Sequence, residues 1–329
     1  MKLFLKNRKR LIAVTIFVAI LMLNIVSYLH AYKFTHFVTG GPKTEKPESL
    51  SFIKKISVLI TGVNVPKKLN TKTPAHYGYE FKSLTIEGSD GLKTPVWEIS
   101  PHKSTYTVIL FHGYSSKKED LLPLGLYFVD KSADVILVDF PGHGDSPYDW
   151  STLGYREAQV VTSVFRHYQA QGKKNIILHG LSLGASSIIT AIHTDKIQPK
   201  ALILEMPFGS LYQTVQSRFE LMGFPVTFPF AELLVFWGGV QNGYNAFDLN
   251  PVDFAGDINV PTLLLGGAGD QRASKSVLQD IYTNLQGHKE LHLFEGLGHV
   301  NLFVRGKNKY EEIVDNFMKD MDSKANSLI

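Results

Sequence analysis

The chain has 329 residues, of which 44% are hydrophobic and 19% charged, so it can bury a sizeable core and is neither disordered nor low-complexity. The formal net charge of +4 arises from basic residues in the first ten positions, and the nearly neutral remainder excludes a nucleic-acid-binding surface. The chain contains no cysteine, which excludes disulfides, a thiolate nucleophile and cysteine-ligated metal.

The first predicted element is a run of 19 uncharged and mostly apolar positions, residues 11–29, which is long enough to cross a bilayer. The run lacks the polar face of a helix packed on a soluble core. A cleaved signal peptide requires small residues before its cleavage site, but the only plausible site, after Leu29-His30-Ala31, has a leucine where a small residue is needed. We therefore interpret the run as a retained transmembrane anchor, with a cleaved signal peptide as the alternative.

The charges on either side of this run predict its orientation. Basic residues precede it, and only Lys33 follows it closely, so residues 1–10 are expected to form a cytoplasmic tail, with the rest of the chain outside the cytoplasm. Residues 30–75 are interpreted as a linker, in which the apolar stretch 52–60 could form a helix on the membrane or on the domain. The basic residues are Lys2, Lys6, Arg8, Lys9 and Arg10.

Residues 76–329 have the pattern of one α/β domain. Two strands joined by a turn are expected within residues 81–100, and further β-rich runs follow, each ending in a glycine-containing loop. Helical periodicity separates the runs and is clearest in residues 154–171 and 310–317. This alternation predicts a mostly parallel sheet covered by helices on both faces, with ligands at the carboxyl ends of its strands. The further runs are 105–114, 133–144, 174–182, 199–209, 260–270 and 289–299.

A Gly-Leu-Ser-Leu-Gly motif, residues 180–184, lies where a buried run gives way to a helical pattern. A serine exposed on a sharp strand-to-helix turn requires neighbours without side chains, although an ordinary glycine-rich turn would have the same sequence pattern. A nucleophilic Ser182 would need a base to take its proton and an acid to orient that base. Asp270 and His299 follow later runs, giving the chain order serine, acid, histidine.

Five short motifs in this order resemble the α/β-hydrolase superfamily over roughly residues 80–320. The similarity is greatest to the branch that contains monoacylglycerol lipase-like and serine aminopeptidase-like enzymes. The resemblance implies an α/β-hydrolase fold, a catalytic triad of Ser182, Asp270 and His299, and chemistry that needs no cofactor or metal. The motifs are HGY at 112–114, DFPGHGDS at 139–146, GLSLG at 180–184, GAGD at 267–270 and GLGH at 296–299.

Other residues compete for the same roles. Glu205 is a rival acid, because it ends an earlier predicted strand. The resemblance gives His112 and His143 loop-building roles, and His179 lies inside a strand before the serine. His299 is the histidine that fits the required order.

Two backbone N–H groups are expected to stabilise the oxyanion of an acyl-transfer intermediate. One is that of Leu183, directly after the nucleophile, at the start of a helix where free N–H groups accumulate. The resemblance implies that the second is that of Tyr114. These two residues form the predicted oxyanion hole.

Residues 209–261 are too many for a single connecting helix and predict a cap insertion. The segment is rich in aromatic residues, including Phe228, Phe230, Phe236 and Trp237, which would line an acyl pocket, pack the cap on the sheet or contact the membrane. The sequence therefore predicts a membrane-anchored serine hydrolase of carboxylic esters, lipid or other acyl esters among them. A peptidase or amidase, and a catalytically idle membrane-tethered binding protein, are the alternatives.

Overall fold

A single sheet of eight strands forms the centre of the part of the chain that the structure describes. The structure is a computed structural model that describes residues 2–45, 47–101, 103–224 and 226–326. The strand order is β1-β2-β4-β3-β5-β6-β7-β8. The strands are β1 (Lys82–Glu87), β2 (Lys93–Ile99), β3 (Tyr106–Phe111), β4 (Ala133–Val138), β5 (Ile176–Leu181), β6 (Ala201–Glu205), β7 (Thr262–Gly267) and β8 (Lys289–Phe294).

The sheet is mostly parallel, as the sequence predicted. Strands β1 and β2 form an antiparallel hairpin, and β2 pairs antiparallel with β4. Every pairing from β4 through β3 and β5 to β8 is parallel. All residues of β4, β6 and β7 are buried, which accounts for their continuous aliphatic runs, because a parallel strand is covered on both faces.

Two apolar cores lie on opposite faces of the sheet. Alternate side chains of β3 divide between them: Ile109 and Phe111 pack with α4, α5 and α9, whereas Val108 and Leu110 pack with α3 and α11. The helices are α1 (Lys2–Thr35), α2 (Phe52–Thr61), α3 (Leu122–Asp130), α4 (Tyr155–Ala170), α5 (Leu183–Asp195), α6 (Leu211–Leu221), α7 (Phe230–Asn242), α8 (Pro251–Phe254), α9 (Lys275–Asn284), α10 (Leu302–Arg305) and α11 (Lys307–Asn326).

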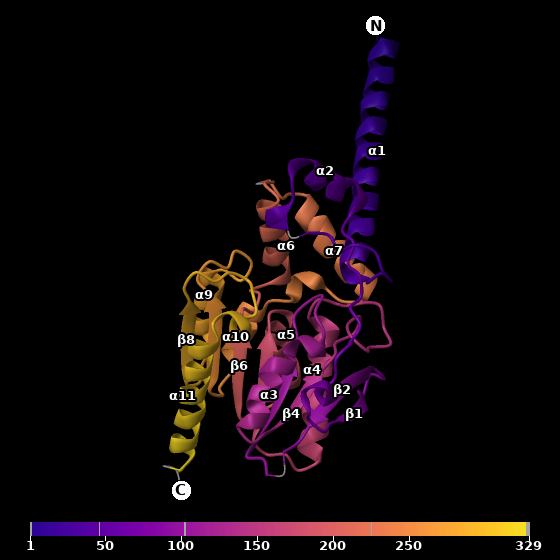
Figure 1. Cartoon of the computed structure of the whole chain (residues 1–329). Helices are drawn as coiled ribbons and strands as arrows, with labels where there is room; N and C mark the ends of the chain where they lie inside the picture. Colours follow the sequence, from indigo (N-terminus) through magenta and orange to yellow (C-terminus); the bar gives the residue numbers. More distant parts are fainter. Residues whose placement is uncertain (1, 46, 102, 225, 327–329) are drawn as a thin grey trace.

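Helices α6 and α7 lie between β6 and β7 in the chain and stand over the carboxyl ends of the strands (Figure 1). Helix α7 packs along the lower part of α1. The Trp237 ring contacts Tyr28 edge-on, and its indole N–H donates a 3.2 Å hydrogen bond to Asn24. The cap helices therefore join the body of the protein to its N-terminal helix.

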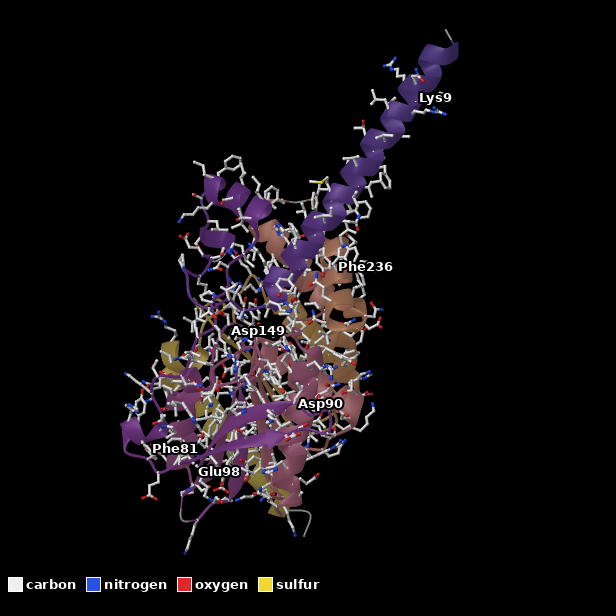
Figure 2. The ribbon with its side chains drawn as sticks, turned by 90° about the vertical axis from the view of Figure 1, so that its right-hand side faces the viewer. Lys9, Phe81, Asp90, Glu98, Asp149 and Phe236 are labelled. Carbon is white, nitrogen blue, oxygen red and sulfur yellow. The ribbon has the colours of Figure 1, made fainter. Side chains whose placement is uncertain are left out.

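Helix α1 contains the predicted run of residues 11–29 and continues to Thr35. Within the described residues, the segment Asn7–Thr35 is the one helix long and apolar enough to cross a membrane, and an 18-residue apolar window within it is almost entirely exposed. Its far end, near Lys9, projects away from the rest of the molecule (Figure 2). Residue 1, residues 327–329 and the side chains of Lys2 and Lys6 lie outside the described part, so the predicted boundaries of the tail and the domain stay predictions.

Candidate active site

Ser182 lies on the sharp turn between β5 and α5. Its φ of 53° and ψ of −108° are strained for a residue with a side chain. The two flanking glycines are required by close backbone contacts: a Cβ at Gly180 would lie 2.5 Å from the Ala185 nitrogen, and one at Gly184 would lie 2.3 Å from the Phe111 carbonyl oxygen. The local geometry is that of a sharp strand-to-helix turn that carries a partly exposed serine, as a nucleophilic serine would require.

His299 and Asp270 meet Ser182 at the carboxyl ends of three strands. The His299 Nε2 atom lies 3.1 Å from the Ser182 Oγ atom, and its Nδ1 atom lies 2.7 Å from Asp270 Oδ2. The other carboxylate oxygen of Asp270 accepts backbone N–H bonds from Arg272 and Ala273, at 2.8 and 3.1 Å. These bonds fix the buried carboxylate, so that it can hold the imidazole with Nε2 free to accept the serine proton.

The rival acid Glu205 lies elsewhere and has other partners. Its Oε1 atom is 2.8 Å from His179 Nε2 and accepts a 2.6 Å hydrogen bond from the Tyr310 hydroxyl. All three side chains are buried beneath the site, and burial raises the pKa of Tyr310 well above its ordinary value. The backbone carbonyl of Glu205 does reach the elbow, where it accepts the Ser182 N–H at 2.7 Å.

His112 and His143 build the loops beside Ser182. The Nε2 atom of His143 accepts the N–H of Ser115 at 2.9 Å, and that of His112 accepts the N–H of Phe140 at 3.2 Å. In each ring the Nδ1 atom lies 2.8 Å from a backbone carbonyl, so the neutral tautomer with hydrogen on Nδ1 satisfies both bonds. Burial lowers the pKa of both imidazoles, and that of His143 falls well below its ordinary value.

The predicted oxyanion donors face the same cavity as the serine. Tyr114, Leu183, Ser182 and His299 all line it. A Cβ at Gly113 would lie 3.5 Å from the Ser182 Cβ, so the loop before Tyr114 runs directly beside the nucleophile. In the described part of the chain, neither the Tyr114 N–H nor the Leu183 N–H donates to a backbone carbonyl outside the helices and strands, as the predicted oxyanion hole requires.

The cavity above Ser182 has a volume of about 350 Å³ and is mainly apolar. Its walls include Phe219 of α6, Leu234 of α7 and, unexpectedly, residues of α1 and α2. Ala31 and Phe34 come from the last turns of α1, and Leu59 comes from α2. Sequence reasoning assigned these residues to a linker. The only available signal was the lack of a glycine or proline before Gly40, which allows the helix to continue past residue 29.

The four aromatic cap residues singled out from the sequence do not line this cavity. Phe228, Phe230 and Phe236 are exposed, and Trp237 packs on α1. None of the four is part of the buried cores between the helices and the sheet. Contact with a membrane stays the remaining expectation for the three exposed phenylalanines.

Comparison with known proteins places this geometry in context. A sequence model described as the alpha/beta hydrolase family matches residues 108–308, a range that contains the three residues of the hydrogen-bonded chain. The uncharacterized protein YqkD of Bacillus subtilis is 21% identical over 252 residues, covering 76% of this chain and 78% of that protein. The uncharacterized membrane protein YNL320W of Saccharomyces cerevisiae is 25% identical over 152 residues, covering 46% and 54%.

Among solved structures, the esterase Pf2001 of Pyrococcus furiosus superposes with a TM-score of 0.63 at 20% sequence identity, covering 78% of this chain and 99% of that one. This likeness and the matched sequence model confirm the fold class that the sequence predicted. The predicted branch within that class stays a prediction.

Proposed function

This chain belongs to the alpha/beta hydrolase family, and from that premise we propose that it is a serine hydrolase that cleaves carboxylic esters through an acyl-enzyme on Ser182. The observation that carries the proposal is the continuous hydrogen-bonded chain from Ser182 through His299 to Asp270. The name of the Pyrococcus furiosus esterase gives further support for an ester substrate.

In the proposed reaction, the Ser182 Oγ attacks the ester carbonyl carbon while His299 Nε2 takes its proton. Asp270 stabilises the imidazolium through Nδ1, and the N–H groups of Leu183 and Tyr114 bind the oxyanion. The tetrahedral intermediate expels the alcohol, which receives its proton from His299. Water, deprotonated by the same imidazole, then attacks the acyl-enzyme, the acid leaves and Ser182 regains its proton.

We also propose that α1 anchors the protein in a membrane, with its basic end in the cytoplasm and the hydrolase domain outside. Support comes from the exposed apolar surface of Asn7–Thr35 and from the name of the yeast relative as a membrane protein. A reporter fused after residue 75 should then lie outside the cytoplasm, and alkaline carbonate should fail to extract the protein. A mature form shortened by about thirty residues would instead indicate a cleaved signal peptide.

The catalytic proposal is tested with the purified full chain in detergent. A fluorophosphonate should label the wild type and the Ser186→Ala variant but not Ser182→Ala, because Ser186 is buried on α5 and bonded to Phe208. Absence of labelling and of turnover would favour an idle binding protein. A preference for aminoacyl amides over esters would favour a peptidase or amidase.

Acyl preference tests the role of the cavity. Each buried methylene contributes about 0.8 kcal/mol, so an ester with three more methylenes than acetate should gain well over tenfold in kcat/KM. Leu234→Trp narrows the cavity and should shift the preference toward shorter esters, whereas Phe236→Ala, outside the cavity, should leave it unchanged. Activity that stays flat or falls beyond acetate would contradict an acyl pocket.

A further inference from the structure

The cavity of Ser182 is walled partly by the helix that we propose as the membrane anchor. An α-helix rises 1.5 Å per residue, so about 20 residues cross a hydrocarbon layer of about 30 Å. Counted from Leu11, such a span ends near His30. Residues 30, 31, 34 and 35 of α1 line the cavity. The wall that α1 contributes to the cavity therefore lies at the edge of the bilayer.

The C-terminal end of helix α2 contacts α1 at this same level. The Lys33 ammonium donates a hydrogen bond to the carbonyl of Thr61, the last residue of α2. Val58 and Leu59 of α2 face the cavity together with α1. A helix held against a membrane span where that span leaves the hydrocarbon lies in the interfacial region.

The outer side of α2 is apolar as well. Ile53 is 80% exposed and Ile60 is 75% exposed, and with Phe52 and Ile56 they follow the three- and four-residue spacing of one helix face. The helix therefore has one apolar side toward the cavity and another that no described part of the protein covers. An apolar helix face that is exposed beside a membrane span is suited to lie at a membrane surface.

The turn between α6 and α7 extends this apolar surface. Val226 and Phe228 are 76% and 71% exposed, and the turn lies at the same end of the molecule as α2 (Figure 1). A Cβ at Gly223 would lie 3.7 Å from the Lys55 ammonium, so turn and helix are neighbours. The side chains of Phe52, Ile53, Ile56, Ile60, Val226 and Phe228 together form what we call the interfacial patch.

We propose that the interfacial patch lies in the bilayer and that the cavity takes its substrate, a membrane-resident acyl ester lipid, directly from the bilayer between α1 and α2. This substrate class rests on the proposed ester hydrolysis at Ser182. The bilayer is the occupant that the structure favours, because the patch adjoins the span at the depth where a 30 Å crossing ends. The test also distinguishes the bilayer from a second copy of the chain or a protein partner bound to the patch.

Contact with the bilayer can be tested without any activity, because the chain has no native cysteine. Single variants Ile53→Cys, Phe228→Cys and Leu69→Cys are labelled with a polarity-sensitive fluorophore and reconstituted in vesicles of phosphatidylcholine and phosphatidylglycerol. Leu69 is the matched control, since it is apolar and 63% exposed but lies outside the patch and the cavity.

The labels at positions 53 and 228 should shift to the blue in vesicles and be quenched by spin-labelled lipid, and the label at position 69 should do neither. If positions 53 and 228 behave like position 69, the patch faces water and the proposal is overturned. A blue shift that lipid quenchers do not affect, present also in detergent, would assign the patch to protein contact and equally overturn it.

The substrate route is tested with the variant Phe52→Ser/Ile53→Ser/Ile60→Ser, beside Leu69→Ser. On a short soluble ester in detergent, both should match the wild type, because none of these side chains lines the cavity. On a long-chain monoacylglycerol delivered in the same vesicles, the patch variant should lose tenfold or more and Leu69→Ser should not. If the patch variant keeps the wild-type activity on the long-chain substrate as well as on the short one, lateral entry is overturned. If instead the wild type is inactive on both esters while lipid quenches the label at position 53, only ester hydrolysis is rejected.

Discussion

The Tyr114 hydroxyl donates a 2.6 Å hydrogen bond to the backbone carbonyl of Phe34. This bond joins the predicted oxyanion loop to the last turn of α1. The ring of Phe37, just beyond the helix, packs on both Tyr114 and His143, with ring centroids 5.5 and 4.5 Å apart. Helix α1, which projects from the molecule, is therefore attached directly beside Ser182. The position of the loop that carries Tyr114 depends on the position of α1.

The first prediction is that Tyr114→Phe weakens this attachment without removing the oxyanion donor. The backbone N–H at position 114 is retained, so hydrolysis of a short ester should stay near the wild-type rate. The Phe34 carbonyl loses its partner, which should lower the free energy of unfolding by about 1–3 kcal/mol. Urea unfolding in a fixed detergent measures the loss, with the exposed Tyr77→Phe as control. An unchanged unfolding curve would show that the bond does not hold α1.

Ser182→Ala and His299→Ala should each reduce kcat on an ester by about 10⁴-fold or more while leaving unfolding unchanged. The double variant should be no slower than the worse single variant, because the serine and its base act as a unit. Single-turnover and steady-state rates measure both effects. Losses that multiply in the double variant would mean that the two residues act in separate steps.

The two candidate acids give opposite expectations. Asp270→Asn should reduce kcat by about 10⁴-fold, because the amide no longer stabilises the imidazolium or its tautomer. Glu205→Gln should reduce kcat only mildly, because Glu205 contacts His179 and Tyr310 rather than His299. It should instead lower thermal stability by disturbing a buried hydrogen-bonded group. A larger kinetic loss in Glu205→Gln would overturn the assignment of the acid.

The features of the fold and of the site that could be predicted from the sequence depend on residues that are close together in the chain. Strands β3 to β7 could be predicted because burial on both faces requires a continuous run of aliphatic residues. The turn at Ser182 could be predicted because its tight backbone requires glycines beside the serine. Asp270 and His299 could be proposed because each lies in the loop that follows a strand, and the ends of parallel strands meet at one edge.

The features that could not be predicted from the sequence depend on contacts between segments that are far apart in the chain. Phe34 lies beside Tyr114, 80 positions later in the chain, and nothing in the pattern of residues 30–75 indicates that partner. Lys118 is completely buried, although lysine is ordinarily exposed, because the loop beginning at Asp139 supplies its counter-ion. Pairings of this kind depend on tertiary packing rather than on local periodicity.

Lys118 supports the loops next to the site, and its loss should be costly. Its ammonium lies 2.6 Å from buried Asp139, 2.7 Å from Asp145 and 4.5 Å from the centre of the Trp97 ring. Lys118→Met leaves the Asp139 carboxylate buried without its counter-charge, and the free energy of unfolding should fall by about 3–5 kcal/mol. Lys118→Met/Asp139→Asn should recover part of that loss, and urea unfolding of the four proteins in this cycle measures it. A double variant less stable than Lys118→Met would contradict the pairing.

The last prediction concerns pH and the two buried loop histidines. Burial lowers the pKa of His112 and His143 in the folded protein, whereas an unfolded histidine titrates near 6.5. Below that value the unfolded chain binds more protons than the folded one, so stability is complete above about pH 6.5 and falls on acidification. Each histidine contributes a slope of at most about 1.4 kcal/mol per pH unit, down to its folded pKa.

Urea unfolding between pH 7.5 and 5.0 in a fixed detergent measures this slope. The change on acidification has a structural cause, since a proton on His143 Nε2 removes the acceptor of the Ser115 N–H. His143→Gln removes one titrating group and should make the slope below pH 6.5 shallower by about one histidine's contribution, up to about 1.4 kcal/mol per unit. His76→Gln, which alters an exposed histidine instead, should leave the slope unchanged. Equal slopes in the wild type and His143→Gln would show that His143 does not stay neutral in the folded protein.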